Sequence, residues 1–289
     1  MKVIAPVLIP AVLAGAMLLA AWGPWSRTAP ERRAWGGVLA LLLAFASGYV
    51  VLVGAPEIPP IGARDTLFWA VTFTALLASG EWLWGASAVV ALPIRFLASG
   101  LTAWFVLASL RQNSWSTGEA ALWIAGIAAV TALVSGVVER TAQPEPGPWL
   151  PLTLWLISST AAAAMVLVST ALMGQLSGSL AAGLGAPVVL AAWNRELTLA
   201  RGAITVFITA HSGLLWQAYF YAELPLTSAL LLYLAPATVG VVLLPNINRL
   251  APWKREAVQL AVAAVPLAIA ILIAYGVYRQ NQSLDANAY

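Results

Sequence analysis

The stretch 149–194 reads WLPLTLWLISSTAAAAMVLVSTALMGQLSGSLAAGLGAPVVLAAWN and contains no Asp, Glu, Lys or Arg in 46 residues. A single α-helix of that length would measure about 70 Å, whereas the hydrocarbon core of a bilayer is about 30 Å thick and needs about 20 apolar residues per crossing. The stretch therefore predicts two membrane-spanning helices that fold back on each other. We expect the turn at the small and polar residues Gly174, Gln175, Ser177, Gly178 and Ser179.

The rest of the chain has the same character. Of its 289 residues 61% are hydrophobic and only 9% are charged, and the mean hydropathy is +0.87; a soluble domain has about 25% charged residues. The apolar runs are continuous and do not alternate with polar residues, which excludes a lipid-facing β-barrel. The sequence predicts an all-α polytopic integral membrane protein, a single membrane domain without a soluble one. The ten predicted spans are 3–22, 34–53, 66–84, 86–108, 120–138, 150–173, 177–193, 202–222, 224–244 and 257–278.

Several cofactor classes are excluded by residue counts. The chain has no cysteine, so it cannot form disulfides, iron–sulfur clusters or thiolate zinc sites. Its one histidine, His211, cannot supply both axial ligands of a b-type haem. We expect no cofactor and no metal. Neither a phosphate-binding loop nor a nucleic-acid module is present, so the expected partners are the lipid bilayer and other membrane proteins, not nucleic acid; no particular small-molecule substrate is indicated.

The distribution of Lys and Arg between the loops predicts the orientation, because cytoplasmic loops retain positive charge. The first, third, fifth, seventh and ninth loops between the predicted spans lie on one face of the membrane. They hold nine such residues: Arg27, Arg32, Arg33, Arg140, Arg195, Arg201, Arg249, Lys254 and Arg255. The other face holds Lys2, Arg64, Arg111 and Arg279. We therefore expect both termini to be non-cytoplasmic. A cleavable signal peptide within the first 25 residues is the competing hypothesis, but cleavage would leave the first three of these arginines on the translocated side.

A polar linker at 139–148 divides the chain into two parts, 1–140 and 141–289, with five predicted spans each. An odd number of spans per half would insert the second half inverted relative to the first, as in many transporters. One correspondence supports this hypothesis: Glu81 ends a span with Pro93 twelve residues later, and Glu223 ends a span with Pro236 thirteen residues later. Coincidence is the alternative, because acidic residues often mark helix ends and membrane helices tolerate proline.

Arg95 and Glu81 form the first part of a candidate intramembrane polar site. Arg95 is the tenth residue of its predicted span, where a charge costs at least about 2.5–3.5 kcal/mol on insertion scales and needs a partner, a cavity or access to the interface. Glu81 lies fourteen residues earlier, across the predicted hairpin turn, and is the expected partner. Two interpretations stay open: a structural ion pair or snorkelled arginine, and a site that lines a polar cavity.

His211, Gln217 and Glu223 complete the candidate site on another predicted span. His211 lies near the middle of that span, and a neutral imidazole can donate one hydrogen bond and accept another. It could relay protons or contact a substrate. The alternative is an interhelical hydrogen bond, which contributes about 0.6 kcal/mol in comparable membrane proteins.

Three functions are compatible with this pattern. A small secondary transporter or channel-like protein would use the five residues of the candidate site. A non-catalytic membrane subunit or scaffold would explain the abundant Ala, Gly, Leu and Trp and the short loops. A membrane-embedded enzyme acting on a lipid-soluble substrate is the least expected, because the sequence shows no cluster of acids, histidines or lysines.

Overall fold

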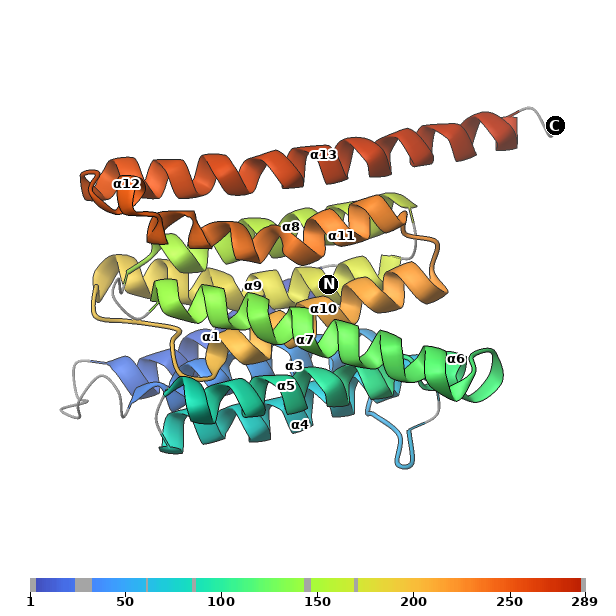
Figure 1. The fold of residues 1–289 in the computed structure, drawn as a ribbon, viewed down its shortest axis with the longest axis horizontal. Helices are drawn as coiled ribbons and strands as arrows, with labels where there is room; N and C mark the ends of the chain where they lie inside the picture. Colours follow the sequence, from blue (N-terminus) through green and yellow to red (C-terminus); the bar gives the residue numbers. More distant parts are fainter. Residues whose placement is uncertain are drawn as a thin grey trace.

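The computed structural model describes residues 4–23, 33–60, 62–84, 87–142, 147–168 and 171–286, and within these ranges it contains helices and no strands. The predicted all-α class is thereby confirmed. The helices lie nearly parallel to the long axis of the molecule (Figure 1). They are α1 (Ala5–Trp22), α3 (Trp35–Leu52), α4 (Ala63–Trp84), α5 (Ala88–Val106), α6 (Ala108–Asn113), α7 (Thr117–Ala142), α8 (Trp149–Val168), α9 (Ala171–Trp193), α10 (Ala203–Tyr221), α11 (Leu226–Leu234), the 3-10 helix η1 (Ala235–Leu243), α12 (Pro245–Asn248) and α13 (Pro252–Ala286).

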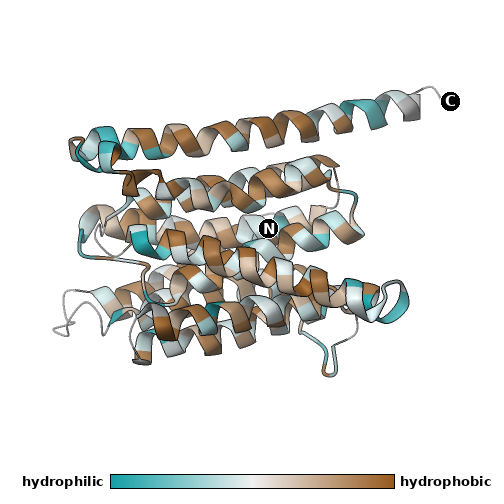
Figure 2. Ribbon diagram, in the orientation of Figure 1, coloured by the Kyte–Doolittle hydropathy of each residue, from teal (hydrophilic) through white to brown (hydrophobic). Residues whose placement is uncertain are grey.

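Nine membrane-spanning candidates, each long and apolar enough to cross a bilayer, occur in the described part of the chain, counting α11 and η1 together as one. The chain thus has the character of a multi-pass membrane protein, and Figure 2 shows apolar residues along the helices and polar ones concentrated toward their ends. The remaining predicted span corresponds to α10, which is 19 residues long but carries polar residues such as His211 and Gln217. Every α10 residue from Ala203 to Ala218 is buried, so protein and not lipid surrounds these polar groups.

The turn predicted at residues 174–179 was wrong. All of these residues lie inside α9. Helix α8 ends at Val168 and α9 begins at Ala171, and residues 169–170 lie outside the described part of the chain. Gly174, Ser177 and Ser179 contact neighbouring helices closely instead. A Cβ on Gly174 would lie 2.8 Å from the carbonyl oxygen of Ala162 in α8. Ser158 and Ser177 each donate a hydrogen bond to the other's carbonyl oxygen, at 3.1 and 3.0 Å.

The span predicted at 224–244 is interrupted. It consists of α11, which ends at Leu234, followed directly by the 3-10 helix η1. Pro236 lies at the beginning of η1 and has no backbone N–H, so it cannot donate the α-helical hydrogen bond to the carbonyl of Leu232. The proline thus accounts for the place of the interruption.

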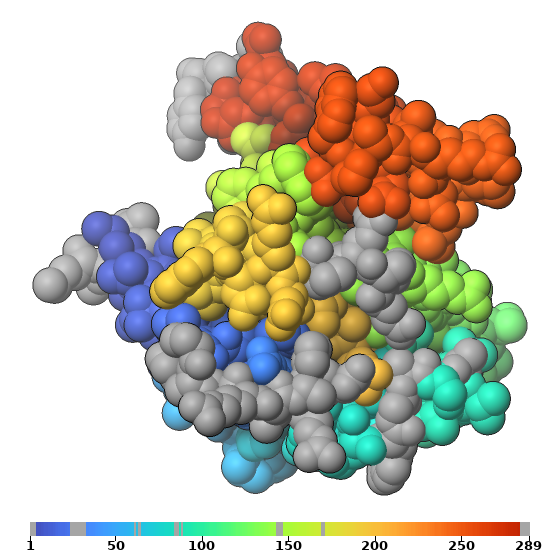
Figure 3. Space-filling model, turned by 90° about the vertical axis from the view of Figure 1, so that its left-hand side faces the viewer, coloured from blue at the N-terminus to red at the C-terminus, as the bar shows by residue number. Residues whose placement is uncertain are grey.

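The most buried helix, α10, packs against α3, α4, α5, α7, α9 and α11. Helix α1 packs on α3 and α9, whereas α13 lies at the periphery on α8, α11 and η1 (Figure 1). We call the end of the bundle where α4 and α7 end and α5 and α10 begin the charged end; it lies on the left in Figure 1 and faces the viewer in Figure 3. The division into two inverted halves and the non-cytoplasmic placement of the termini stay predictions.

Candidate functional site

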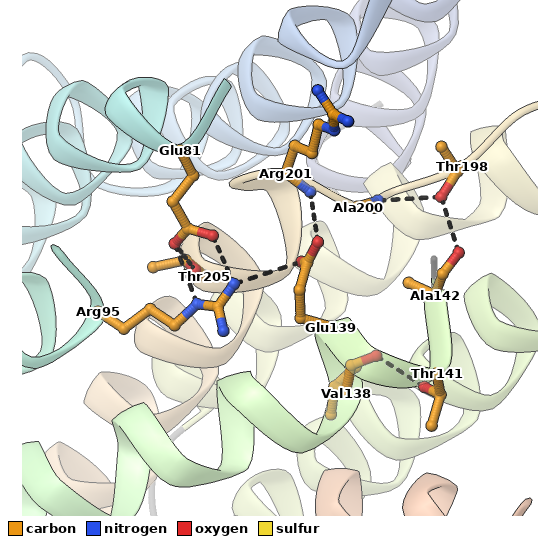
Figure 4. A network of polar contacts seen from close by, with 10 residues as sticks. All are labelled: Glu81, Arg95, Val138, Glu139, Thr141, Ala142, Thr198, Ala200, Arg201 and Thr205. Atoms are coloured by element: carbon orange, nitrogen blue, oxygen red, sulfur yellow. Dashed lines mark hydrogen bonds and ion pairs between the residues drawn. The ribbon is translucent and has the colours of Figure 1, made fainter. Parts of the chain in front are cut away.

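Three charged side chains, Glu81, Arg95 and Glu139, meet inside the charged end, and we call them the ion cluster (Figure 4). Arg95 donates two hydrogen bonds to Glu81, from Nε to Oε1 at 3.1 Å and from Nη2 to Oε2 at 2.6 Å. The same Nη2 lies 3.9 Å from Oε2 of Glu139. Glu81 is 0% exposed, Arg95 6% and Glu139 2%. Water therefore screens these charges poorly. The pairing of Glu81 with Arg95 that the sequence predicts is confirmed.

The helix ends explain how the three side chains reach one another. Glu81 and Glu139 each lie three residues before the end of their helix, which is about 4.5 Å along the axis at 1.5 Å per residue. Arg95 lies seven residues after the start of α5, about 10 Å deep, so its long side chain reaches back toward the helix ends. Gly136 of α7 lies beside the guanidinium, since a Cβ there would be in van der Waals contact with Nη1 of Arg95 at 3.6 Å.

The connection between α9 and α10 covers Glu139. The backbone N–H of Arg201 donates to Oε1 of Glu139 at 2.7 Å, while the guanidinium of Arg201 is directed away from the ion cluster (Figure 4). The next residue, Gly202, has φ +106, and a Cβ there would overlap the carbonyl oxygen of Ala78 in α4. Only glycine satisfies both constraints, so Gly202 fixes how this connection enters α10.

Hydroxyl side chains continue from the ion cluster into the bundle. They recur every three or four residues on three helices, so that each helix turns one polar face toward the others. The members are Arg95, Ser99 and Thr102 on α5, Glu139, Ser135 and Thr131 on α7, and Thr205, Thr209 and Ser212 on α10. We call this set, together with Glu81 and Thr74 of α4, the polar column; all of its members are buried. Thr205 donates to Oε1 of Glu81 at 2.6 Å and so joins the column to the ion cluster.

A small cavity lies where the three helices face each other. Five column hydroxyls line it, from Ser99, Thr102, Thr131, Thr209 and Ser212. Its volume of about 10 Å³ is close to that needed for one water molecule. Among the described residues, the hydroxyls of Ser99 and Ser135 have no hydrogen-bond partner. Buried hydroxyls that lack partners are costly, which makes this part of the column receptive to water or a polar ligand.

Aromatic rings close the column at its inner end. Trp216 lines the small cavity and is part of a continuous group of rings with centroids 4.7–6.1 Å apart. This aromatic plug consists of Trp115, Trp123, Trp216, Tyr219, Phe220 and Tyr233. The hydroxyl of Tyr233 forms a hydrogen bond of 2.7 Å with the hydroxyl of Thr131, and it donates to the carbonyl oxygen of Ile127 at 3.1 Å. The polar column is therefore bounded by ions at the charged end and by aromatic rings toward the other.

The structure does not bring His211, Gln217 or Glu223 into the ion cluster. His211 is two residues from Thr209, about 200° around the helix, and so faces away from the polar column. Its ring stacks on Phe207, and Nε2 lies 3.2 Å from the Leu232 carbonyl oxygen that Pro236 leaves without its helical donor. Since a carbonyl only accepts, Nε2 donates this hydrogen bond, which agrees with the structural alternative for His211.

The other two predicted residues also lie apart. Gln217 is buried at the far part of α10, and Glu223 is exposed in the connection after α10, with φ 59. Conversely, sequence reasoning missed Glu139, which it assigned to the polar linker, and Thr205. The signal that could have found both is the spacing of polar residues along α7 and α10.

Comparison of the chain with protein-family models, with curated proteins and with solved structures found no match.

Proposed function

We propose that the chain is a small secondary transporter and that the polar column is part of its transport route. The observation that carries this proposal is the continuity of the column, in which a buried ion cluster at one end joins a line of hydroxyls on three helices. Ionisable residues inside a membrane protein are expensive, and they commonly mark the pathways of ions and substrates.

The depth of the polar column supports the proposal. Ser99 lies eleven residues past the start of α5 and Thr131 eleven residues before the end of α7, so both are about 17 Å from the charged end. Thr102 is about 21 Å deep by the same measure. Because the hydrocarbon core is about 30 Å thick, the column reaches the middle of the membrane and stops at the aromatic plug. A polar column that aromatic rings block toward one side corresponds to one of the two states that alternating access requires.

The interrupted span adds a second argument. Discontinuous helices beside a midplane site recur in secondary transporters. Here Tyr233, the second-to-last residue of α11, packs against Trp216 with ring centroids 5.2 Å apart, and η1 begins two residues later. A movement at the α11–η1 interruption would therefore act on the aromatic plug.

The test is uptake by proteoliposomes that contain the purified chain. They are challenged in turn with gradients of inorganic cations, amino acids, organic acids, amines and sugars. We expect uptake of at least one class, its loss in Arg95→Gln, and its retention in Thr160→Val, a control outside the polar column whose hydroxyl donates to the carbonyl of Leu156 in its own helix. If no class enters faster than into protein-free vesicles, the transporter proposal is overturned, and stable co-purification with another membrane protein would then favour the subunit hypothesis.

A further inference from the structure

A cavity of about 490 Å³ lies at the charged end, outside the polar column, and we call it the basic cavity. Its walls come from the last two turns of α1, from Arg33 before α3, and from the end of α9 with the connection to α10. Helix α1 packs on both α3 and α9 there. The volume is within the range of small-molecule sites, about 300–1,000 Å³.

The walls of the basic cavity change from apolar to charged along the bundle axis. Leu18 and Leu19 of α1 and Leu190 of α9 lie three or four residues before the ends of their helices, about 4.5–6 Å inside them. Arg33 and Arg195 lie beyond the helices, two residues before α3 and two residues after α9. Leu19 is exposed, so the cavity adjoins the outer surface of the bundle. An amphiphile with a charged head and an apolar tail matches this order.

The charged wall favours an anion. Glu196, the one acidic residue of the wall, lies 4.0 Å from Arg33. Arg33 is also held at the ring of Trp22, with its guanidinium carbon 5.5 Å from the ring centre. The positive charge of Arg33 is thus already engaged, and the charge offered to a ligand is that of Arg195, whose side chain is exposed at the cavity.

Asn194 holds Arg195 in place beside α1. Its Nδ2 donates to the carbonyl oxygen of Trp22 at 3.1 Å, and its Oδ1 accepts the backbone N–H of Glu196 at 3.1 Å. The connection after α9 is therefore tied to the end of α1, with Arg195 between the two bonded residues. Trp22 and Trp193 line the cavity at the helix ends, and tryptophan is enriched at the level of the lipid headgroups.

We propose that the basic cavity binds an anionic phospholipid, with the phosphate against Arg195 and the upper part of an acyl chain against the leucines. Basic pockets between membrane helices on the cytoplasmic side bind anionic headgroups, and the predicted orientation puts the charged end on that side. A zwitterionic lipid would bring its own cation toward the arginines. A soluble anion would leave the apolar wall uncovered. The inference does not involve the polar column, so it holds or fails independently of transport.

The first test is native mass spectrometry of the purified full chain with phosphatidylglycerol and with phosphatidylcholine of the same acyl chains. We expect one phosphatidylglycerol molecule to bind more tightly than phosphatidylcholine. Arg195→Gln should weaken its binding about fivefold, because an arginine near a membrane surface contributes about 1 kcal/mol. Arg140→Gln is the matched control: it removes an exposed positive charge at the same end of the bundle, outside the cavity, and should leave binding unchanged.

Equal binding of the two lipids, or equal weakening by Arg195→Gln and Arg140→Gln, overturns the proposal. Glycerol phosphate carries the phosphate without the acyl chains and should not displace the lipid. Displacement would indicate a site for soluble phosphate compounds and would overturn the lipid assignment.

The second test locates the bound lipid. Phosphatidylglycerol with a photoactivatable acyl chain is crosslinked to the parent protein in vesicles, and the modified peptides are identified. We expect crosslinks in 18–23 and 190–197. Crosslinks confined to 252–255, where a tryptophan is also followed by two cations, would place the lipid at α13 and contradict the proposal.

Discussion

The hydrogen-bonded ion pair between Glu81 and Arg95 gives the sharpest energetic prediction. Arg95 donates two hydrogen bonds to Glu81, and hydrogen bonds to charged groups contribute about 1.5–3 kcal/mol each. Removing one partner of a buried ion pair costs about 3–5 kcal/mol, because the other charge stays buried. We therefore expect Arg95→Gln to lower the free energy of unfolding by about 3–5 kcal/mol. It would remove the cation that is hydrogen-bonded to the buried carboxylate of Glu81.

A double-mutant cycle isolates the pair itself. Unfolding of the parent, Glu81→Gln, Arg95→Gln and the double variant is measured in mixed micelles, with Thr160→Val as the control for an exposed hydroxyl. We expect a coupling free energy of about 3 kcal/mol. Ordinary interhelical hydrogen bonds in membrane proteins give about 0.6 kcal/mol, so a coupling of that size would refute the reasoning.

Three further substitutions test the fold around the site by the same unfolding measurement. Gly202→Ala should lower the free energy of unfolding by about 3 kcal/mol or more, because its positive φ and the overlap of the new Cβ with backbone act together. Gly178→Ala is the control and should not destabilise the protein, because nothing lies within 4 Å of the new Cβ. Equal effects of the two substitutions would contradict this prediction. His211→Ala should lower the free energy of unfolding by about 1–3 kcal/mol in the parent protein. The loss should be clearly smaller in a Pro236→Ala background, where the new backbone N–H can donate to the Leu232 carbonyl in place of His211. An equal loss in both backgrounds would show that this hydrogen bond does not contribute to stability. Ser116→Ala should cost about 1 kcal/mol, because Ser116 and the glutamate three residues later cap α7 reciprocally; no loss of stability would argue against the cap.

The membrane-spanning helices were predictable from the sequence, because their length and composition depend on residues that are neighbours along the chain. Charge-free runs of about 20 residues define membrane helices, because the bilayer tolerates little else. The turn predicted near Gly174 failed because glycine in membrane helices often serves packing, as it does here against α8. The interruption at Pro236 could have been anticipated from the missing N–H, but its compensation by His211 depends on how α10 is turned relative to α11.

The candidate site was predictable where its partners are neighbours in sequence. Glu81 and Arg95 lie fourteen residues apart on consecutive helices, and the long arginine side chain spans the difference in depth between them. Glu139 and Thr205 reach the same point from distant segments, and only the packing of α7 and α10 brings them there. His211 was grouped with the ionisable residues by depth alone, since the sequence does not say which neighbour its helix face meets.

Thiol accessibility tests most directly whether the polar column is a water-accessible route from the charged end. The chain has no cysteine, so Ser135→Cys reports on the column and Leu133→Cys, at a position 62% exposed on the outside of the same helix, is the matched control. A membrane-impermeant thiol reagent should modify Ser135→Cys from the charged end, should not modify it from the other side, and should leave Leu133→Cys in the lipid unmodified. Labelling of Ser135→Cys no faster than that of Leu133→Cys, or only from the opposite side, would contradict the assignment of the column as a route.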